Sequence, residues 1–384
     1  MCGAPIRPIA IFHDRPPSSN FQVRKRMTDH SFLKALPAAP QPDGIDDTTG
    51  LVSGSFGIGT FRDGQGPAFP GVVLPGGGVY SLADEYRDTH AVFEDWARAS
   101  NLANDVAAKQ DRHAYDYQAL TILPVLAHPN MLCAGSNYRR HVAEMMTFNK
   151  FNQDKRIAGE TDEQFFERNL LEIDRRAREG MPYFWTGLHS SLCGANDDVP
   201  LPLVGEHPDW ELEFGAIVGK TGRYIRPDEA GALLAAYVMV NDLGTVDEFR
   251  RADVRFMFDW VSKHQPNFKP FGPFAVPKEF VDRNKVQIRL KVNGEIRQDW
   301  PISDMIFQPE QILSYASERI RLVPGDLLLT GSPPGNGAMW GNAWLKPGDV
   351  MESEITYLGR QTNRIVAEET GGRSPTYGPF ITEW

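Results

Sequence analysis

The segment that most constrains the fold spans residues 209–220 and reads DWELEFGAIVGK. Its apolar half, residues 214–218, predicts a buried strand that ends in a glycine turn. Alternate side chains of a strand share one face, so we expect Asp209, Glu211 and Glu213 to point the same way. Carboxylates that meet on a buried face need protons or a cation to compensate their charge.

A second apolar run, residues 235–240, ends at Asn241 and Asp242. Two glutamates and an aspartate from a neighbouring strand end form an all-oxygen ligand set, which suits Mg²⁺ or Mn²⁺ with positions left open. The alternative is an ordinary solvated strand face, because acidic residues often alternate on exposed strands. The apolar run that directly follows Glu213 argues against that alternative.

Three further positions are candidates for catalysis. His141 and Glu144 are three residues apart, so a helix places them on one face. A carboxylate that orients an imidazole raises the basicity of its other nitrogen, although such pairs also occur on solvated helices. Lys263 precedes a β-like stretch, residues 268–276. Its ammonium group can neutralise a developing oxyanion. The alternative is an ordinary surface lysine.

A turn-rich loop, residues 329–337, follows another apolar strand. Its backbone N–H groups and the Ser332 hydroxyl can bind a carboxylate or an oxyanion. The loop is not a Gly-x-Ser-x-Gly elbow, so Ser332 is not expected to be a nucleophile.

Composition excludes several classes of protein. The 35 glycines and 29 prolines among 384 residues favour many turns and short strands over a helical bundle. A formal charge of −10 argues against nucleic-acid binding. No apolar run approaches the roughly 18 residues of a membrane helix. Three widely spaced cysteines form no disulfide framework, which predicts a cytoplasmic protein.

Stretches rich in turn-forming residues divide the chain into three predicted parts. Residues 1–50 are expected to be an irregular arm, 51–130 a small α+β module, and 131–384 the catalytic domain. A charged insertion, residues 145–181, interrupts the last part. It contains a capping-box pattern at 161–164 that predicts a helix, which is either a lid or a surface helix packed on the core. Beyond it, Asn-Gly at 293–294 predicts a β-hairpin and 309–319 a helix.

The order of these motifs resembles the fumarylacetoacetate hydrolase family over residues 131–365. The first block is G-x-N-Y-x-x-H-x-x-E at 135–144, and the second is D-aromatic-E-x-E at 209–213. N-D-x-x-x-x-D at 241–247, K-x4-F-x-P-x-G-P at 263–273 and Gly-Ser-Pro at 331–333 follow. The segment 51–130 is also similar to the small N-terminal module of many family members.

The resemblance implies an α+β, mostly β, roll-like or sandwich-like catalytic domain that forms a homodimer. It implies Mg²⁺ or Mn²⁺ on Glu211, Glu213 and Asp242. It also implies a general base formed by His141 and Glu144, on a segment that orders when substrate binds, with Lys263 near the substrate oxygens. The residues implied to contact substrate are Tyr138, Arg139, Gly331 and Ser332.

Departures from the family pattern indicate a different pocket. Val246 stands where the family commonly has a substrate-contacting arginine, and the lysine usual before Ser-x-x-Gly is absent from residues 185–189. Two lost cations predict a substrate that is less anionic or bulkier than the family's diacids. His189 and His264 are predicted to line that pocket.

The predicted function is a metal-dependent hydrolase of small-molecule catabolism that cleaves a C–C bond in a β-diketo or acylpyruvate-type 2-oxo acid. The alternative is a lyase or isomerase of a 2-oxo-3-deoxy sugar acid, which uses the same metal and base without water attack. A third hypothesis, a degenerate binding or scaffold protein, is disfavoured because His141, Glu144, Lys263 and all three predicted metal carboxylates are retained.

Overall fold

The computed structural model describes residues 32–148, 150–249, 251–253 and 260–380. Most of the predicted N-terminal arm, residues 1–31, therefore lies outside the described residues. The chain forms two units, Met1–Ala35 and Leu36–Trp384. The elements below all belong to the second unit.

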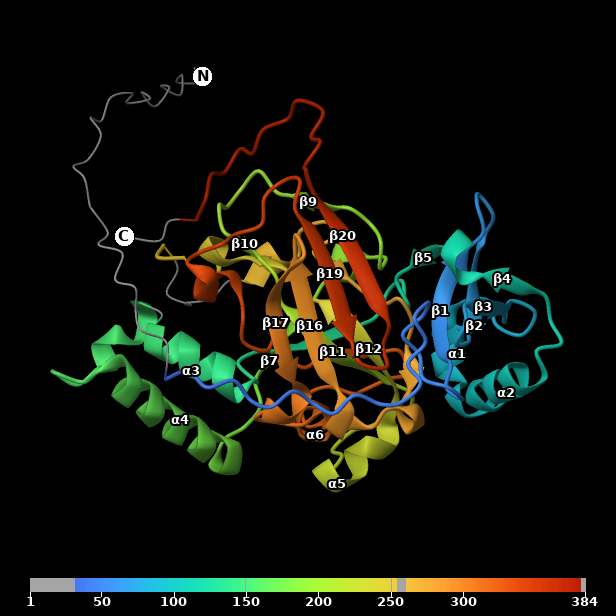
Figure 1. The fold of residues 1–384 in the computed structure, drawn as a ribbon, viewed down its shortest axis with the longest axis horizontal. Helices are drawn as coiled ribbons and strands as arrows, with labels where there is room; N and C mark the ends of the chain where they lie inside the picture. Colours follow the sequence, from blue (N-terminus) through green and yellow to red (C-terminus); the bar gives the residue numbers. More distant parts are fainter. Residues whose placement is uncertain (1–31, 149, 250, 254–259, 381–384) are drawn as a thin grey trace, which may run out of the picture. The chain divides into compact units, whose positions relative to one another are not determined.

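The first part of this unit is an antiparallel sheet with two helices (Figure 1). Its strand order is β4-β3-β2-β1-β5. Apolar side chains of the first strands, among them Ile58 and Val72, share a buried cluster with Val92 and Ala99 of the helices. The elements are β1 (Gly57–Arg62), β2 (Ala68–Val73), β3 (Gly78–Ser81), α1 (Thr89–Glu94), α2 (Trp96–Lys109), β4 (Ala114–Asp116) and β5 (Thr121–Leu123).

A six-stranded mixed sheet, in the order β15-β12-β11-β18-β6-β7, contains Glu213 and has Glu211 and Asp242 directly at the ends of its strands. Strands β11 and β12 are buried along their whole length and run antiparallel, with Leu212 opposite Asn241. The strands are β6 (Met131–Ala134), β7 (Phe184–Gly187), β11 (Leu212–Val218), β12 (Leu234–Asn241), β15 (Val276–Pro277) and β18 (Leu327–Leu329).

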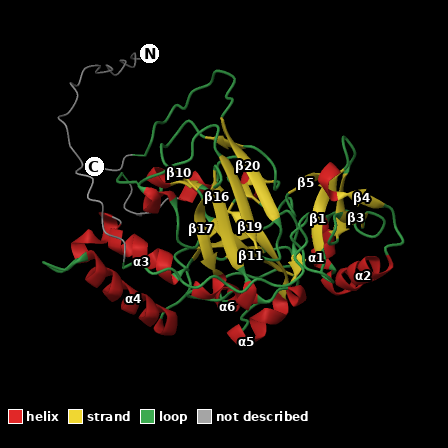
Figure 2. Ribbon diagram, in the orientation of Figure 1, coloured by secondary structure: helices red, strands yellow, loops and turns green. Residues whose placement is uncertain are grey.

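A five-stranded sheet, β17-β16-β19-β20-β9, packs against β11 through β16 (Figure 2). The predicted hairpin is confirmed: β16 and β17 are joined at Asn293 and Gly294, which both adopt the positive φ that such a turn requires. The strands are β9 (Val199–Leu201), β16 (Gln287–Val292), β17 (Glu295–Pro301), β19 (Val350–Ile355) and β20 (Arg360–Ala367).

Two short two-stranded sheets accompany these larger sheets. Strand β10 (Pro208–Asp209) pairs with β13 (Gly244–Thr245), and β8 (Leu192–Cys193) pairs in parallel with β14 (Lys269–Pro270). The α+β, mostly β, class predicted from the sequence is confirmed.

The insertion forms a long helix, α4 (Asp162–Glu179), which lies alongside α3 (Arg139–Phe148) (Figure 1). The predicted capping box is confirmed, because the Thr161 side chain accepts a hydrogen bond from Gln164 N and the Gln164 side chain accepts one from Thr161 N. Elsewhere in the unit, α5 (Pro227–Ala230) contacts α6 (Pro309–Ser317), the helix expected near 309–319. No helix in the described ranges is long and apolar enough to cross a membrane.

Candidate metal centre and active site

Strand register brings three predicted carboxylates together. Glu211 and Glu213 flank Leu212, the residue that pairs with Asn241 across β11 and β12. Asp242 follows directly, and its backbone N–H donates to Glu211 O at 2.8 Å. One carboxylate oxygen from each of Glu211, Glu213 and Asp242 therefore lies within 4.8 Å of the others.

Asp209 does not join this triad, unlike the sequence-based expectation that three carboxylates share a face. It belongs to the separate strand β10, and its Oδ1 accepts hydrogen bonds from Trp210 N and Gly337 N, both at 2.8 Å. Burial raises the pKa of Asp209 to about 8. Asp209 thus fixes the loop around Gly337.

Two buried lysines meet at Asp242. Lys263 Nζ lies 2.9 Å from Asp242 Oδ2 and 3.0 Å from Glu211 Oε2. Lys269 Nζ bonds Asp242 Oδ1 and donates to Lys263 O at 2.8 Å. Burial opposes the charged form of Asp242, but the two ammonium groups hold its pKa below the ordinary value. Every oxygen of this carboxylate is thus bonded to a cation.

Lys269 was missed by the sequence analysis. It lies inside the apolar stretch 268–276 and is completely buried. A lysine in such a stretch needs a buried acidic partner, because burial of an unpaired ammonium group is very unfavourable. That signal was present in the sequence, but the identity of the partner depended on the fold.

The triad fits a divalent cation. Its donors are all oxygens, as Mg²⁺ and Mn²⁺ prefer. Three carboxylates and two lysines leave a formal charge of −1, since −3 + 2 = −1. Burial first, and then the charges of Asp242 and Glu211, raise the pKa of Glu213 well above its ordinary value, so the ionised form of this group needs a cation nearby. A cation between these oxygens removes the repulsion.

Helix α3 carries the predicted general base. The Nδ1 atom of His141 is buried. It forms no hydrogen bond with any described residue. Burial and the charge of Lys263 lower the pKa of His141 to about 4, so the imidazole is neutral near pH 7. Its nitrogen is therefore able to accept a proton.

Glu144 is not paired with His141 in the structure. Its Oε1 instead accepts a hydrogen bond from Arg140 Nε at 2.5 Å. Burial raises the pKa of Glu144 to about 7, although Arg140 acts in the opposite direction. The structure thus places both predicted residues on α3 without joining them, and their catalytic roles stay a prediction.

The predicted substrate-contacting residues are largely engaged within the chain. Arg139 makes a two-point pair with Asp174 of α4, at 2.6 and 2.9 Å. Gly331 N donates to Glu213 Oε2 at 2.6 Å, and Ser332 Oγ accepts a hydrogen bond from Gln298 Nε2 at 3.0 Å. Tyr138, the fourth residue, is fully buried, and burial raises its pKa well above the ordinary value. The 331–332 loop therefore orients Glu213.

The two histidines predicted to line the pocket lie in different surroundings. His264 packs on Trp185 with ring centroids 5.4 Å apart, and its Nε2 is buried without a hydrogen-bond partner in the described ranges. Burial lowers the pKa of His264 to about 4. His189 is exposed, and its ring packs edge-on against His128 at 4.8 Å.

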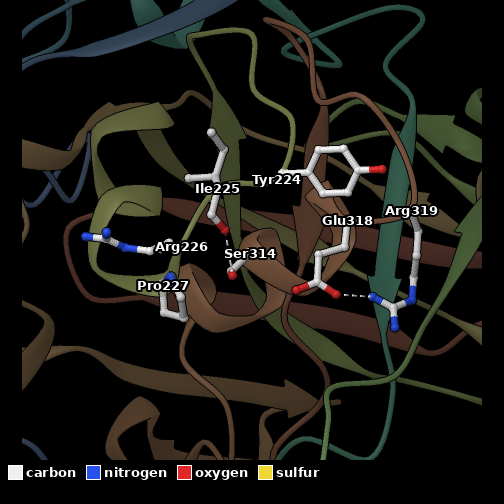
Figure 3. Close-up of a pocket in the computed structure, with 7 residues that line it drawn as sticks. All are labelled: Tyr224, Ile225, Arg226, Pro227, Ser314, Glu318 and Arg319. Carbon is white, nitrogen blue, oxygen red and sulfur yellow. Dashed lines mark hydrogen bonds and ion pairs between the residues drawn. The ribbon is translucent and has the colours of Figure 1, made fainter.

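Two surface pockets are separate from the triad. One, of about 480 Å³, lies beside α5 and α6 (Figure 3). Its polar groups are already paired, since Glu318 binds Arg319 and Ser314 Oγ donates to Ile225 O. The other, of about 410 Å³, lies between α3 and α4. Neither pocket is lined by a triad residue.

The fold and this acidic centre correspond to one known family. The family model described as fumarylacetoacetate (FAA) hydrolase C-terminal matches residues 130–366, which is more than half of the chain. The chain belongs to this family, as its motif order predicted.

Individual relatives refine this assignment. The chain is 40% identical over 179 residues to 2,4-didehydro-3-deoxy-L-rhamnonate hydrolase of Sphingomonas sp. (strain SKA58), covering 46% of this chain and 62% of that protein. It is 29% identical over 251 residues to the mitochondrial oxaloacetate tautomerase Fahd2a of Rattus norvegicus, a match that covers 65% of this chain and 70% of that protein. The match thus spans less than two thirds of the first relative.

A solved structure shares the fold. The fumarylacetoacetate hydrolase from psychrophilic Exiguobacterium antarcticum is 26% identical, with a TM-score of 0.62 over 82% of this chain and all of that chain. The two relatives are, by name, a hydrolase and a tautomerase. The homologues of this chain are therefore enzymes.

Proposed function

We propose that this protein is a divalent-metal-dependent hydrolase that cleaves a C–C bond in a 2,4-dioxo acid, a β-diketo acid of the acylpyruvate type, in small-molecule catabolism. The observation that carries the proposal is the triad of Glu211, Glu213 and Asp242, whose oxygens converge within 4.8 Å. The name of the 40% identical relative supports it, because a 2,4-didehydro-3-deoxy sugar acid has oxo groups at C2 and C4.

These three carboxylates would hold Mg²⁺ or Mn²⁺. The bound ion supplies polarisation of the 2-oxo acid and stabilises negative charge on its oxygens. Lys263 adds a second positive charge at the same place, because its Nζ lies within 3.0 Å of both Glu211 and Asp242. A fixed cation beside a developing enolate oxygen lowers the barrier without reorganisation.

His141 is the proposed general base. Its neutral imidazole takes a proton from water, and the resulting hydroxide oxygen bonds to the C4 carbonyl carbon. The C3–C4 bond then breaks, its electron pair forms the enolate of the 2-oxo acid, and C3 takes up a proton. The products are one carboxylic acid and one 2-oxo acid. Glu144 lies four residues after Arg140 and three after His141 on the same helix. Once its carboxylate has left Arg140, it would orient the His141 imidazole.

A second candidate, a tautomerase, isomerase or lyase, uses the same base differently. His141 removes a proton from the carbon next to the carbonyl, and no C–C bond is hydrolysed. The similarity to an oxaloacetate tautomerase favours this candidate. A 2-oxo-3-deoxy sugar acid is the corresponding substrate class for the lyase or isomerase.

Product analysis separates the two candidates. The purified full chain is incubated with Mg²⁺ or Mn²⁺ and with acylpyruvates, 2,4-dioxo sugar acids, oxaloacetate and 2-oxo-3-deoxy sugar acids, and products are identified by mass. Two fragments support the hydrolase, whereas one rearranged or dehydrated product supports the second candidate. Absence of turnover together with absence of metal binding overturns both.

A matched pair of variants tests the base. We expect His141→Ala to lower kcat by about 10²- to 10⁴-fold. His113→Ala is the control, because His113 is exposed and packs only on Tyr115 in its described ring contact. Equal activity of the two variants would remove His141 from the mechanism. The proposal also includes a homodimer, which light scattering of the full chain tests.

A further inference from the structure

A group of aromatic side chains stands beside the metal centre. Trp185 stacks on Trp260 with centroids 5.5 Å apart and planes 13° apart. Phe249 packs on the same Trp260 at 5.3 Å, and Trp260 Nε1 donates to the Tyr183 hydroxyl at 2.9 Å. We call Tyr183, Trp185, Phe249 and Trp260 the aromatic wall. Trp185 lies in β7 and Tyr183 directly precedes this strand, whereas Phe249 and Trp260 come much later in the chain.

The wall contacts both lysines of the centre. Lys269 Nζ lies 5.2 Å from the centroid of the Trp185 ring, and Lys263 Nζ lies 5.4 Å from that of Phe249. Both ammonium groups bond Asp242. The aromatic wall is therefore separated from a predicted metal ligand by one side chain.

The aromatic wall is not fully buried in the core. Tyr183 is 43% exposed, and Trp185 and Trp260 are only partly buried, whereas Trp210 in the core is 1% exposed. His264 packs on Trp185 and keeps a buried Nε2 without a hydrogen-bond partner among the residues described. Partly exposed aromatic side chains and a buried polar atom without a described partner thus occur together next to the metal centre.

We propose that the aromatic wall binds the uncharged distal chain of the substrate, a deoxy-sugar or hydroxyalkyl chain, while the 2-oxo acid group binds at the triad. This inference rests on the proposed function and specifies its substrate class. The electron-rich face of an indole attracts C–H groups and disfavours an anion. His264 Nε2 then hydrogen-bonds a hydroxyl group of the chain.

The same features select against a second carboxylate. Among the described residues that touch the aromatic wall, the cations Lys263 and Lys269 are both paired with Asp242. A distal carboxylate would lose its hydration against indole rings without gaining a counter-charge from either of these lysines, which is unfavourable. Neutral sugar-derived chains are therefore preferred over diacids of equal length.

Ligands of different length test this inference. Calorimetry with the Mn²⁺-loaded full chain compares oxalate, which reaches only the metal centre, with a six-carbon 2-oxo-3-deoxy sugar acid and with 2-oxoadipate. For Trp260→Ala we expect the affinity for the sugar acid to fall at least tenfold and that for oxalate to change less than twofold. Trp260→Phe, which retains a ring, should restore most of the loss.

Tyr377→Ala is the control, since Tyr377 is 86% exposed and lies outside the wall. Equal losses for oxalate and the sugar acid in Trp260→Ala, or no loss for either, overturn the inference. A wild-type preference for 2-oxoadipate overturns it as well. Failure of the wild-type protein to bind Mn²⁺ and oxalate is a distinct result, because it overturns the proposed function itself.

Discussion

The carboxylate triad and helix α3 supply the two halves of the candidate site, and they are held in different ways. Glu211, Glu213 and Asp242 are fixed by the register of two fully buried strands. His141 is placed by a helix that is joined to α4 through side chains, by Arg139 with Asp174 and by Thr147 with Asn169, while Arg140 binds Glu144 within the helix.

This difference separates a preformed half from an adjustable half. Moving a triad residue requires a change in strand pairing inside the core, which close packing resists. Moving α3 requires the exchange of side-chain partners, and the half-exposed Arg139–Asp174 pair is weak in water. We propose that Glu144 reaches His141 by leaving Arg140, with the sheet unchanged. Four predictions test this contrast.

The largest effect is expected from the preformed half. Asp242→Asn removes a charged ligand while retaining the shape of the side chain. Mn²⁺ affinity should fall at least about 100-fold, because loss of even an outer-shell partner lowers metal affinity 10- to 100-fold. Isothermal calorimetry measures this, with Asp198→Asn as the control, since Asp198 pairs with Arg364 at the surface. Unchanged affinity would remove Asp242 from the metal site.

The second prediction concerns the charge that holds Asp242. Lys269→Met leaves Asp242 Oδ1 without its cation, and breaking a buried ion pair in this way typically destabilises by about 3–5 kcal/mol. Denaturant unfolding measures the loss against Lys278→Met, whose ammonium group donates to the carbonyl of Gly231. Equal stability of the two variants would show that strand packing alone fixes the triad.

The third prediction uses Glu144, whose folded-state pKa of about 7 exceeds the usual 4.5. Between these pH values the folded protein keeps a proton that the unfolded chain has lost. The free energy of unfolding should thus fall as pH rises from 4.5 to 7, by at most about 3 kcal/mol from this group. Glu144→Gln should flatten that slope relative to Glu369→Gln, an exposed control. An unchanged slope would contradict the burial of an uncharged Glu144.

The smallest effect is expected at the link between α3 and the insertion. Asp174→Asn breaks the ion pair with Arg139. Because the side chains of Arg139 and Asp174 are 41% and 35% exposed, the free energy of unfolding should fall by less than about 1 kcal/mol. Thermal unfolding measures the change. A loss of several kcal/mol would mean that this pair, and not the packing of Phe165 and Phe166, fastens α4.

Much of the fold was predictable because its signals are local. The capping box at Thr161 and the Asn293–Gly294 hairpin depend on residues a few positions apart, and both are confirmed. The convergence of Glu211, Glu213 and Asp242 also followed from two strand ends that meet in a hairpin-like pair. The partner of Glu144 was not predictable, because Arg140 and His141 are both within helical reach and only packing selects one.

The sequence by itself determined the buried strand that follows the acidic residues, the two-residue spacing of Glu211 and Glu213 and the order of the family motifs. These depend on chain chemistry and on the two-residue period of a strand, which need no tertiary context. Only the tertiary structure decided that Asp209 leaves the triad, that Lys269 joins it and that Trp185 stacks on Trp260. These contacts join segments up to 128 residues apart, and their geometry is set by how the sheets and loops pack.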